Sequence, residues 1–160
     1  MESGRFWLDN ELEANVDRPK VMVALRDPES VASLMTLAIH LSNSMDAELV
    51  ALHVVEVPLA TPLEAEDEIL DHAGKEILAA ATRVAERSSA KLSTELLRAR
   101  EAGEAIAGEA KDRGADLLIV GHHRAHPSAL GEVVLGSTAQ YVARHAPCRV
   151  LIQIPPPKPR

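Results

Sequence analysis

Short apolar runs alternate with amphipathic stretches along most of this chain. Residues 117–120 form an unbroken apolar run, which is typical of a buried parallel strand, and 21–25 and 49–55 are predicted to be buried strands as well. The apolar segment 148–154 predicts a last strand. Residues 91–98 alternate only in part between apolar and polar, as a less buried edge strand does. The stretches between these five segments place apolar residues at helical spacing, so the pattern predicts five strands and four helices in strict alternation.

Strict alternation of strands and helices predicts one parallel sheet. Right-handed crossovers place the helices on both faces of such a sheet. We expect an open five-stranded sheet of order 3-2-1-4-5, with 117–120 central and 91–98 at an edge. The reversal of strand order then lies between 21–25 and 117–120.

Local signals mark where the predicted helices begin and end. Asp27 and Pro28 suit an N-cap and a first helical position, and Gly114 suits the C-terminal cap of a helix over 102–113. A long helix is predicted over 64–89, and a last helix between Gly136 and Pro147. We expect the buried stripe of the long helix to consist of Leu70, Ala73, Ile77, Ala81 and Val84.

The carboxyl ends of the two strands at the reversal predict a ligand site. Open α/β sheets bind ligands beyond these ends. A helix N-terminus nearby presents free backbone N–H groups that hold phosphates. We expect the crevice to be lined by Arg26, Asp27, 121–124 and 136–138. The alternatives are that Ser137 only caps its helix and that Arg124 is a solvated loop residue.

Composition limits the classes of function. The 160 residues make one domain, and a net charge of −7 with 2% aromatic residues excludes a phosphate-backbone binder and base stacking. A single cysteine permits no internal disulfide. No apolar run is long enough to insert into a membrane, and the N-terminus lacks the pattern of a signal peptide. We therefore expect a cytoplasmic protein or the cytosol-facing part of a membrane protein.

The ends of the chain differ from its middle. Residues 1–18 are polar and acidic except for Phe6–Leu8, which indicates a flexible tail that docks this triplet on the domain, or a linker or partner-docking segment. The domain itself is expected over 19–155. Residues 156–160 form a proline-rich tail that cannot extend a strand.

Several of these segments resemble the universal stress protein family over nearly all of residues 19–155. They are Val23–Leu25 leading into a helix, the Leu-His-Val-Val of 52–55, the Ala-Asp-Leu-Leu-Ile-Val-Gly of 115–121, the Leu-Gly-Ser of 135–137 and the Ala-Pro-Cys-Arg-Val-Leu of 146–151. The resemblance implies a Rossmann-like fold of the adenine-nucleotide alpha-hydrolase type that dimerises. Some branches of the family bind ATP and others bind no nucleotide.

The ATP-binding branch carries a glycine pattern that this chain matches at both ends. Gly121 matches its first position and Gly136 with Ser137 its last, while Arg124 replaces the second glycine and the spacing is lengthened by two residues. Gly131 lies in the lengthened loop, and Arg26 stands where the family has an acid. The resemblance implies ATP or another adenine nucleotide, with Mg²⁺ only as a nucleotide-bound ion, at Arg26, Asp27, Val54, Gly121, His122, Arg124, Gly131, Gly136, Ser137 and Thr138.

Other reactive side chains favour structural roles. His122, His123 and His126 share one loop but have no cysteine or carboxylate at ligand spacing, so no metal site is expected. His53 suits a hydrogen-bonded core imidazole, and Cys148 an inert buried thiol. No hydrolase motif or general base is present, so we expect no enzyme activity.

Two functions from different classes stay open. One is a nucleotide sensor; the other is an interaction module without nucleotide, including the cytosolic regulatory domain of a membrane transporter. A third, a slow nucleotide hydrolase, lacks a general base. We expect a homodimer through the apolar edge of 148–154, the competing arrangement being a monomer whose Phe6–Leu8 covers that edge.

Overall fold

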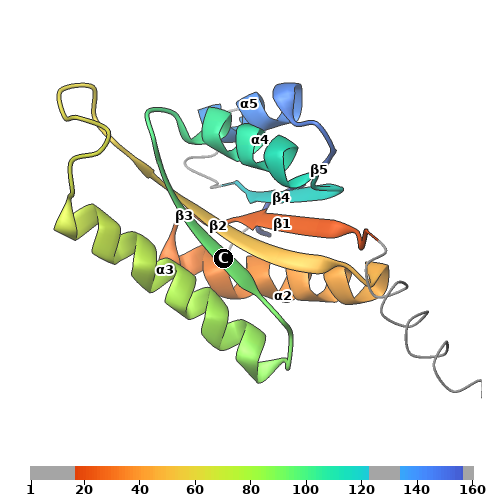
Figure 1. Cartoon of the computed structure of the whole chain (residues 1–160). Coiled ribbons are helices and arrows are strands. Elements are labelled where there is room, and N and C mark those ends of the chain that lie inside the picture. The colour runs from red at the N-terminus through yellow and green to blue at the C-terminus, as the bar shows by residue number, and fades with distance from the viewer. Residues whose placement is uncertain (1–16, 123–133, 157–160) are drawn as a thin grey trace, which may run out of the picture.

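A computed structural model describes residues 17–122 and 134–156 of the chain. Strands and helices alternate through it (Figure 1). Their bounds are β1 Lys20–Ala24, α2 Pro28–Met45, β2 Glu48–Glu56, α3 Glu68–Arg87, β3 Ser93–Ala99, α4 Ala102–Arg113, β4 Leu117–Gly121, α5 Ser137–His145 and β5 Arg149–Gln153. The predicted order of elements is confirmed.

The five strands form one parallel sheet in the order β3-β2-β1-β4-β5, as predicted. The middle strand is β1, so the expectation that 117–120 is the central strand was wrong by one place. β4 is nonetheless an inner strand, paired to β1 on one side and to β5 on the other. β3 lies at an edge, as its partial alternation predicts.

Each face of the sheet is covered by a pair of helices. Helices α2 and α3 lie on one face, and α4 and α5 on the other (Figure 1). The first face buries Val21, Val23 and Ile119, while Met22, Leu118 and Val120 point to the second. Successive side chains of β1 and β4 thus enter opposite cores, which explains their unbroken apolar runs.

The long helix differs from its prediction in both start and phase. α3 begins at Glu68 rather than at residue 64, because the Asp67 carboxylate accepts hydrogen bonds from the backbone N–H groups of Ile69 and Leu70. Leu70 and Ala73 are exposed instead of buried. The helix buries Gly74, Ile77, Leu78, Ala81 and Ala85. The predicted stripe was therefore right at Ile77 and Ala81 but wrong in its first turn.

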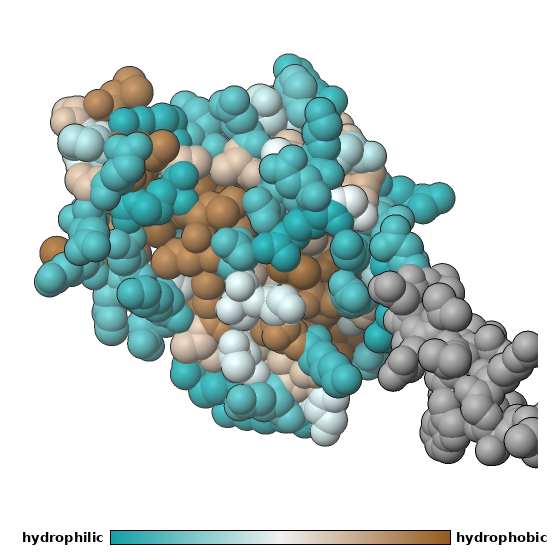
Figure 2. Space-filling view, viewed as in Figure 1, coloured by the Kyte–Doolittle hydropathy of each residue, from teal (hydrophilic) through white to brown (hydrophobic). Residues whose placement is uncertain are grey.

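One edge of the sheet carries apolar surface. β3 lies in front of β2 in the view of Figure 1, and Figure 2 shows brown, apolar surface in the middle of this face between hydrophilic side chains. The partly buried side chains that pack near this edge include Leu92, Leu96 and Leu97. Among the described residues, no helix is long and apolar enough to cross a membrane.

Candidate functional site

The carboxyl ends of β1 and β4 lie side by side, as the predicted reversal of strand order requires. Ala24 of β1 is the register partner of Val120 of β4. The chain leaves these partners as Leu25-Arg26 and Gly121-His122 at the same end of the sheet. Arg26 is exposed, and His122 is half-buried. Two of the predicted segments are therefore brought together by parallel pairing.

Helix α5 begins at this same end of the sheet. Only three residues separate its last residue, His145, from the start of β5 at Arg149. The helix therefore runs opposite to the strands and its C-terminus lies at their amino ends. Its N-terminus, at Gly136 and Ser137, must then lie at the carboxyl end. Chain direction thus places 136–138 at the same end of the sheet as the carboxyl ends of β1 and β4.

The first turn of α5 offers main-chain donors. Gly136 is the N-cap, with φ −64° and ψ 164°, and Ser137 is the first helical residue. The alternative that Ser137 caps the helix is therefore wrong by one position. The first N–H to bond within the helix is that of Gln140, which donates to the carbonyl of Gly136 at 3.0 Å. The N–H groups that precede it in the helix have no acceptor within the helix. In other proteins, such unpaired N–H groups at a helix N-terminus bind phosphate.

Space in front of α5 is open where a ligand would approach. A Cβ atom added at Gly136 would meet no atom of the described residues within 4 Å. Gly121 is different, because a Cβ there would lie 3.0 Å from Cδ1 of Leu34 in α2. The fold itself gives Gly121 a packing reason, since α2 crosses the end of β4 at close range. At the predicted crevice, packing among the described residues therefore explains Gly121 but not Gly136.

Asp27 is the N-cap residue of α2, as predicted, but its side chain makes no capping hydrogen bond to the helix. Ser30 bonds instead to the Asp27 main-chain carbonyl, through its backbone N–H at 3.2 Å and its hydroxyl at 3.0 Å. No capping bond from the α2 backbone reaches the half-buried carboxylate. The N-cap role of Asp27 is therefore a main-chain one.

Val54 and Thr138 complete the described part of the predicted site. Val54 lies near the carboxyl end of β2 and packs with the core between the sheet, α4 and α5. Its side chain thus points to the same face on which α5 begins. Thr138 is half-buried in the first turn of α5. Arg124, Gly131, His123 and His126 lie outside the described residues.

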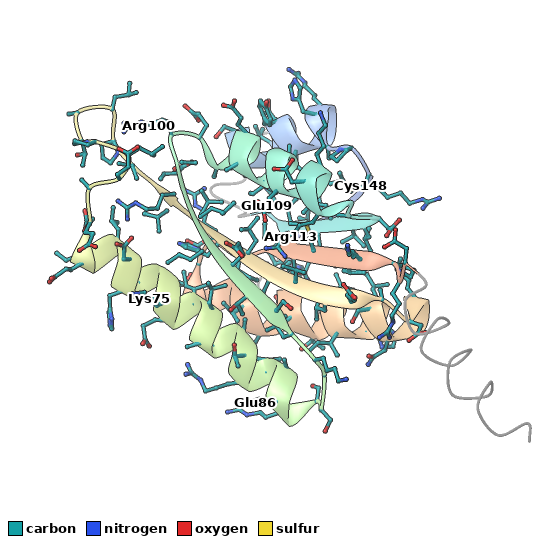
Figure 3. The ribbon with its side chains drawn as sticks, in the orientation of Figure 1. Lys75, Glu86, Arg100, Glu109, Arg113 and Cys148 are labelled. Carbon is teal, nitrogen blue, oxygen red and sulfur yellow. The ribbon has the colours of Figure 1, made fainter. Side chains whose placement is uncertain are left out.

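The structure adds a loop clamp that the sequence analysis missed. Two arginines at the end of β3 hold the loop that joins β2 to α3. Arg100 donates from Nη1 to the carbonyls of Val57 and Thr61, at 3.1 and 2.8 Å, and to that of Pro58. Arg98 donates to the carbonyls of Leu63 and Ala65 and pairs with Asp71 in α3. Arg100 lies beside this loop in Figure 3. The signal available in sequence was two arginines at a strand end, opposite a proline-containing loop.

Two hollows lie away from the predicted crevice. One of about 340 Å³ adjoins the clamped loop and is lined by Glu56, Val57, Pro58, Leu59, Arg100 and Glu101. A wider one of about 750 Å³ follows the outer side of α2. Neither contains a predicted site residue.

The reactive side chains outside the crevice are structural in character. His53 is half-buried, with Nδ1 at 2.8 Å from the carbonyl of Leu25, which confirms the expected hydrogen-bonded imidazole. Cys148 is half-buried as well, rather than fully buried. Burial and then the charge of Asp116 raise the pKa of its thiol. The described part of the chain contains no group of three or more histidine, cysteine or acidic side chains that could hold a metal.

Comparisons with a family model and with individual proteins point to the same family. The model of the universal stress protein family matches residues 18–153. A universal stress protein of Methanocaldococcus jannaschii is 34% identical over 127 residues, covering 76% of this chain and 73% of that protein. Universal stress protein A homolog 2 of Coxiella burnetii is 33% identical over 141 residues, covering 82% and 92%.

Solved structures share the fold. A universal stress protein from Archaeoglobus fulgidus aligns with a TM-score of 0.70 at 18% identity, over 86% of this chain and 98% of that one. A complex of the A. fulgidus protein with dAMP aligns at 0.64 and 17% identity, covering 84% and 95%. A family protein from Arabidopsis thaliana with AMP bound aligns at 0.59 and 21% identity, covering 85% and 91%.

Proposed function

Since this chain belongs to the universal stress protein family, we propose that it binds an adenine nucleotide as a non-catalytic sensor. The nucleotide lies across the carboxyl ends of β1 and β4, with its phosphate at the N-terminus of α5. The observation that carries the proposal is the open first turn of α5. No atom of the described residues lies within 4 Å of a Cβ position at Gly136, and helical N–H groups follow this residue directly.

The relatives support the choice of an adenine nucleotide. Structures with the same fold are described with AMP, dAMP and cAMP bound. All three ligands pair an adenine with a single phosphate, and one helix N-terminus suffices for one phosphate. We therefore favour AMP as the first ligand to test, with ADP and ATP beside it.

The other side chains of the crevice fit this arrangement. Val54 offers an apolar surface to a base on the face where α5 begins. Arg26 is an exposed cation where the family carries an acid, so it suits a phosphate better than a ribose hydroxyl. This charge favours nucleotides over nucleosides. The absence of a sequence motif with a general base is the reason for proposing a sensor without fast turnover.

Titration calorimetry of the full-length chain with AMP, ADP, ATP and adenosine tests the proposal. We expect saturable binding of at least one nucleotide and weaker binding of adenosine, which lacks the phosphate. Native mass spectrometry of the freshly purified protein reports any nucleotide it carries already. Silence from all four ligands at millimolar concentration would overturn the proposal. The chain would then be an interaction module, with a membrane transporter among the partners to examine.

A further inference from the structure

The imidazole of His53 is hydrogen-bonded to the backbone just after β1 ends. Its Nδ1 lies 2.8 Å from the carbonyl oxygen of Leu25. A carbonyl only accepts, so Nδ1 must carry the proton and donate it. The backbone N–H of Leu25 donates to the carbonyl of Leu52 at 2.8 Å. β2 therefore holds both polar groups of Leu25, one through its main chain and one through an imidazole.

The held carbonyl belongs to the peptide that leads into the crevice. β1 ends at Ala24, and the side chain of Leu25 is buried with 2% exposure. The next residue, Arg26, is exposed, and Asp27 precedes α2. Because the peptide unit is planar, fixing the Leu25 carbonyl also fixes the direction of the Arg26 N–H and the path of the chain into Arg26.

Helix α3 leaves the imidazole no room to move away from this carbonyl. A Cβ added at Gly74 would lie 2.8 Å from Cδ2 of His53 and 2.8 Å from Cδ1 of Leu96. Gly74 is buried, so the ring is confined between the helix backbone and the end of β1. A displacement of α3 at this point would therefore reach the Leu25 carbonyl through the ring.

We infer that His53 is a positioning residue for the nucleotide crevice. It acts through the Leu25 carbonyl on the backbone of Arg26 and Asp27. The inference rests on the proposed nucleotide binding. His53 does not touch the ligand in this arrangement; it sets the backbone from which Arg26 and Asp27 extend. Gly74 of α3 leaves room for the imidazole in this position, because it has no Cβ atom.

Amide substitutions at position 53 separate the hydrogen bond from packing. Asn places its amide nitrogen near the position of Nδ1 and keeps a donor for the Leu25 carbonyl, whereas Gln places it near Nε2. Leu has no donor. We expect His53→Asn to bind AMP as the wild type does, and His53→Gln and His53→Leu to bind about fivefold more weakly, the effect of one lost hydrogen bond.

The amide signals of Arg26 and Asp27 report directly on the backbone that His53 is inferred to position. In the ¹H–¹⁵N spectrum of the ligand-free full-length chain, the amides of Arg26 and Asp27 should shift in His53→Leu and return in His53→Asn. Gly74→Ala should produce the same shifts, because its Cβ displaces the ring. Gly108→Ala is the matched control, since a Cβ there would meet nothing within 4 Å.

The possible outcomes distinguish a failure of the positioning role of His53 from a failure of the proposed nucleotide binding. If the wild type binds AMP and His53→Leu binds it equally, or if Asn weakens binding as much as Leu, the positioning role is overturned. If the Arg26 and Asp27 amides do not move in His53→Leu, it is overturned as well. If the wild type binds no nucleotide, the proposed function fails first and the role at the site falls with it. Urea unfolding of each variant identifies losses that come from instability alone.

Discussion

At the scale of single residues, Gly121 and Gly136 differ in whether packing requires a glycine. A side chain at Gly121 would press on Leu34, so substitution there alters the fold and the site together. Gly136 has an ordinary φ of −64° and open space beyond it. Any residue can adopt that backbone. Only Gly136 therefore offers a substitution that tests ligand approach without disturbing packing.

We predict that Gly136→Val abolishes nucleotide binding while the fold stays intact. The branched side chain would occupy the space through which a phosphate reaches the first turn of α5. Calorimetry with AMP measures the binding, and urea unfolding should show a loss of no more than about 1 kcal/mol in the free energy of unfolding, because valine is a poorer N-cap than glycine. Undiminished AMP binding by this variant would show that the phosphate does not lie at α5.

Cys148 gives a prediction that depends on pH. Burial and the nearby carboxylate of Asp116 raise the pKa of its thiol, so less thiolate is present in the folded chain at pH 8 than in the unfolded chain. Cys148 lies just before β5 (Figure 3). Iodoacetamide should therefore alkylate the native protein more slowly than the urea-unfolded protein at the same pH. Asp116→Asn removes one cause and should accelerate the native reaction; an unchanged rate would contradict the role of its charge.

At the scale of elements, single groups decide where helices and loops stop. α4 ends at Gly114, whose φ of +64° lies in the left-handed region. Arg113, in the last turn of α4, bridges Glu109 of the same helix and Glu95 of β3 (Figure 3). Hydrogen bonding to Glu109 raises the pKa of this guanidinium, so it keeps its charge throughout the physiological range. The end of α4 is thus fixed by one backbone conformation and one side-chain network.

Two glycines of this region give opposite predictions for the same substitution. Gly114→Ala should destabilise the protein by about 1 kcal/mol, because alanine is strained at positive φ. Gly108→Ala, inside α4 and with open space around its Cβ position, should stabilise it by about 0.5–1 kcal/mol. Urea unfolding measures both. Equal effects of the two substitutions would mean that α4 does not end at the left-handed residue.

The clamp on the loop between β2 and α3 gives a prediction about local opening. Arg100→Gln removes a charged donor to the carbonyls of Val57, Pro58 and Thr61. A protease that cuts after glutamate should then cleave faster within the loop, at Glu64 or Glu66, than in the wild type. Peptide mapping by mass spectrometry locates the cuts. The loop would be stable without the clamp if cleavage rates were the same, and Arg100→Lys should behave like Gln because it cannot bond several carbonyls at once.

At the scale of the whole molecule, the open sheet leaves two edges with unpaired backbone groups. β3 is bordered by charged pairs, since Glu95 bonds to Arg113 and Arg98 to Asp71. β5 carries only Arg149 as a charged residue, and Ile154 just beyond it is 37% exposed. Charged side chains along an edge strand oppose pairing, and β5 carries fewer of them than β3. We therefore propose that β5, not β3, pairs with a second copy of this chain.

The corresponding prediction compares one substitution on each edge. Ile154→Lys should convert a dimer into a monomer in light scattering, because two lysines would meet near the two-fold axis. Thr94 is an exposed residue of β3, so Thr94→Lys adds the same charge to that edge and should leave the dimer unchanged. A monomeric wild type that associates after removal of residues 1–17 would favour the competing arrangement, in which the N-terminal tail covers the edge.

The sequence by itself determined the elements, their order and the strand reversal. Apolar periodicity is a local property, and right-handed crossovers leave few ways to arrange alternating strands and helices. It also determined that the segments following β1 and β4 lie at one edge of the sheet, because parallel strands place their carboxyl ends together. His53 was predicted as a bonded imidazole from its place within a buried strand.

Only the tertiary structure decided which partner each polar group takes. The Leu25 carbonyl meets His53 because β1 and β2 pair in one register, and the ring stays there because α3 crosses at Gly74. The phase of α3 followed from its capping by Asp67, which moved its first turn out of the core. The two clamp arginines bond to loop carbonyls that are 33 to 43 residues away in the chain. Such contacts depend on distances that the periodicity of one segment does not contain.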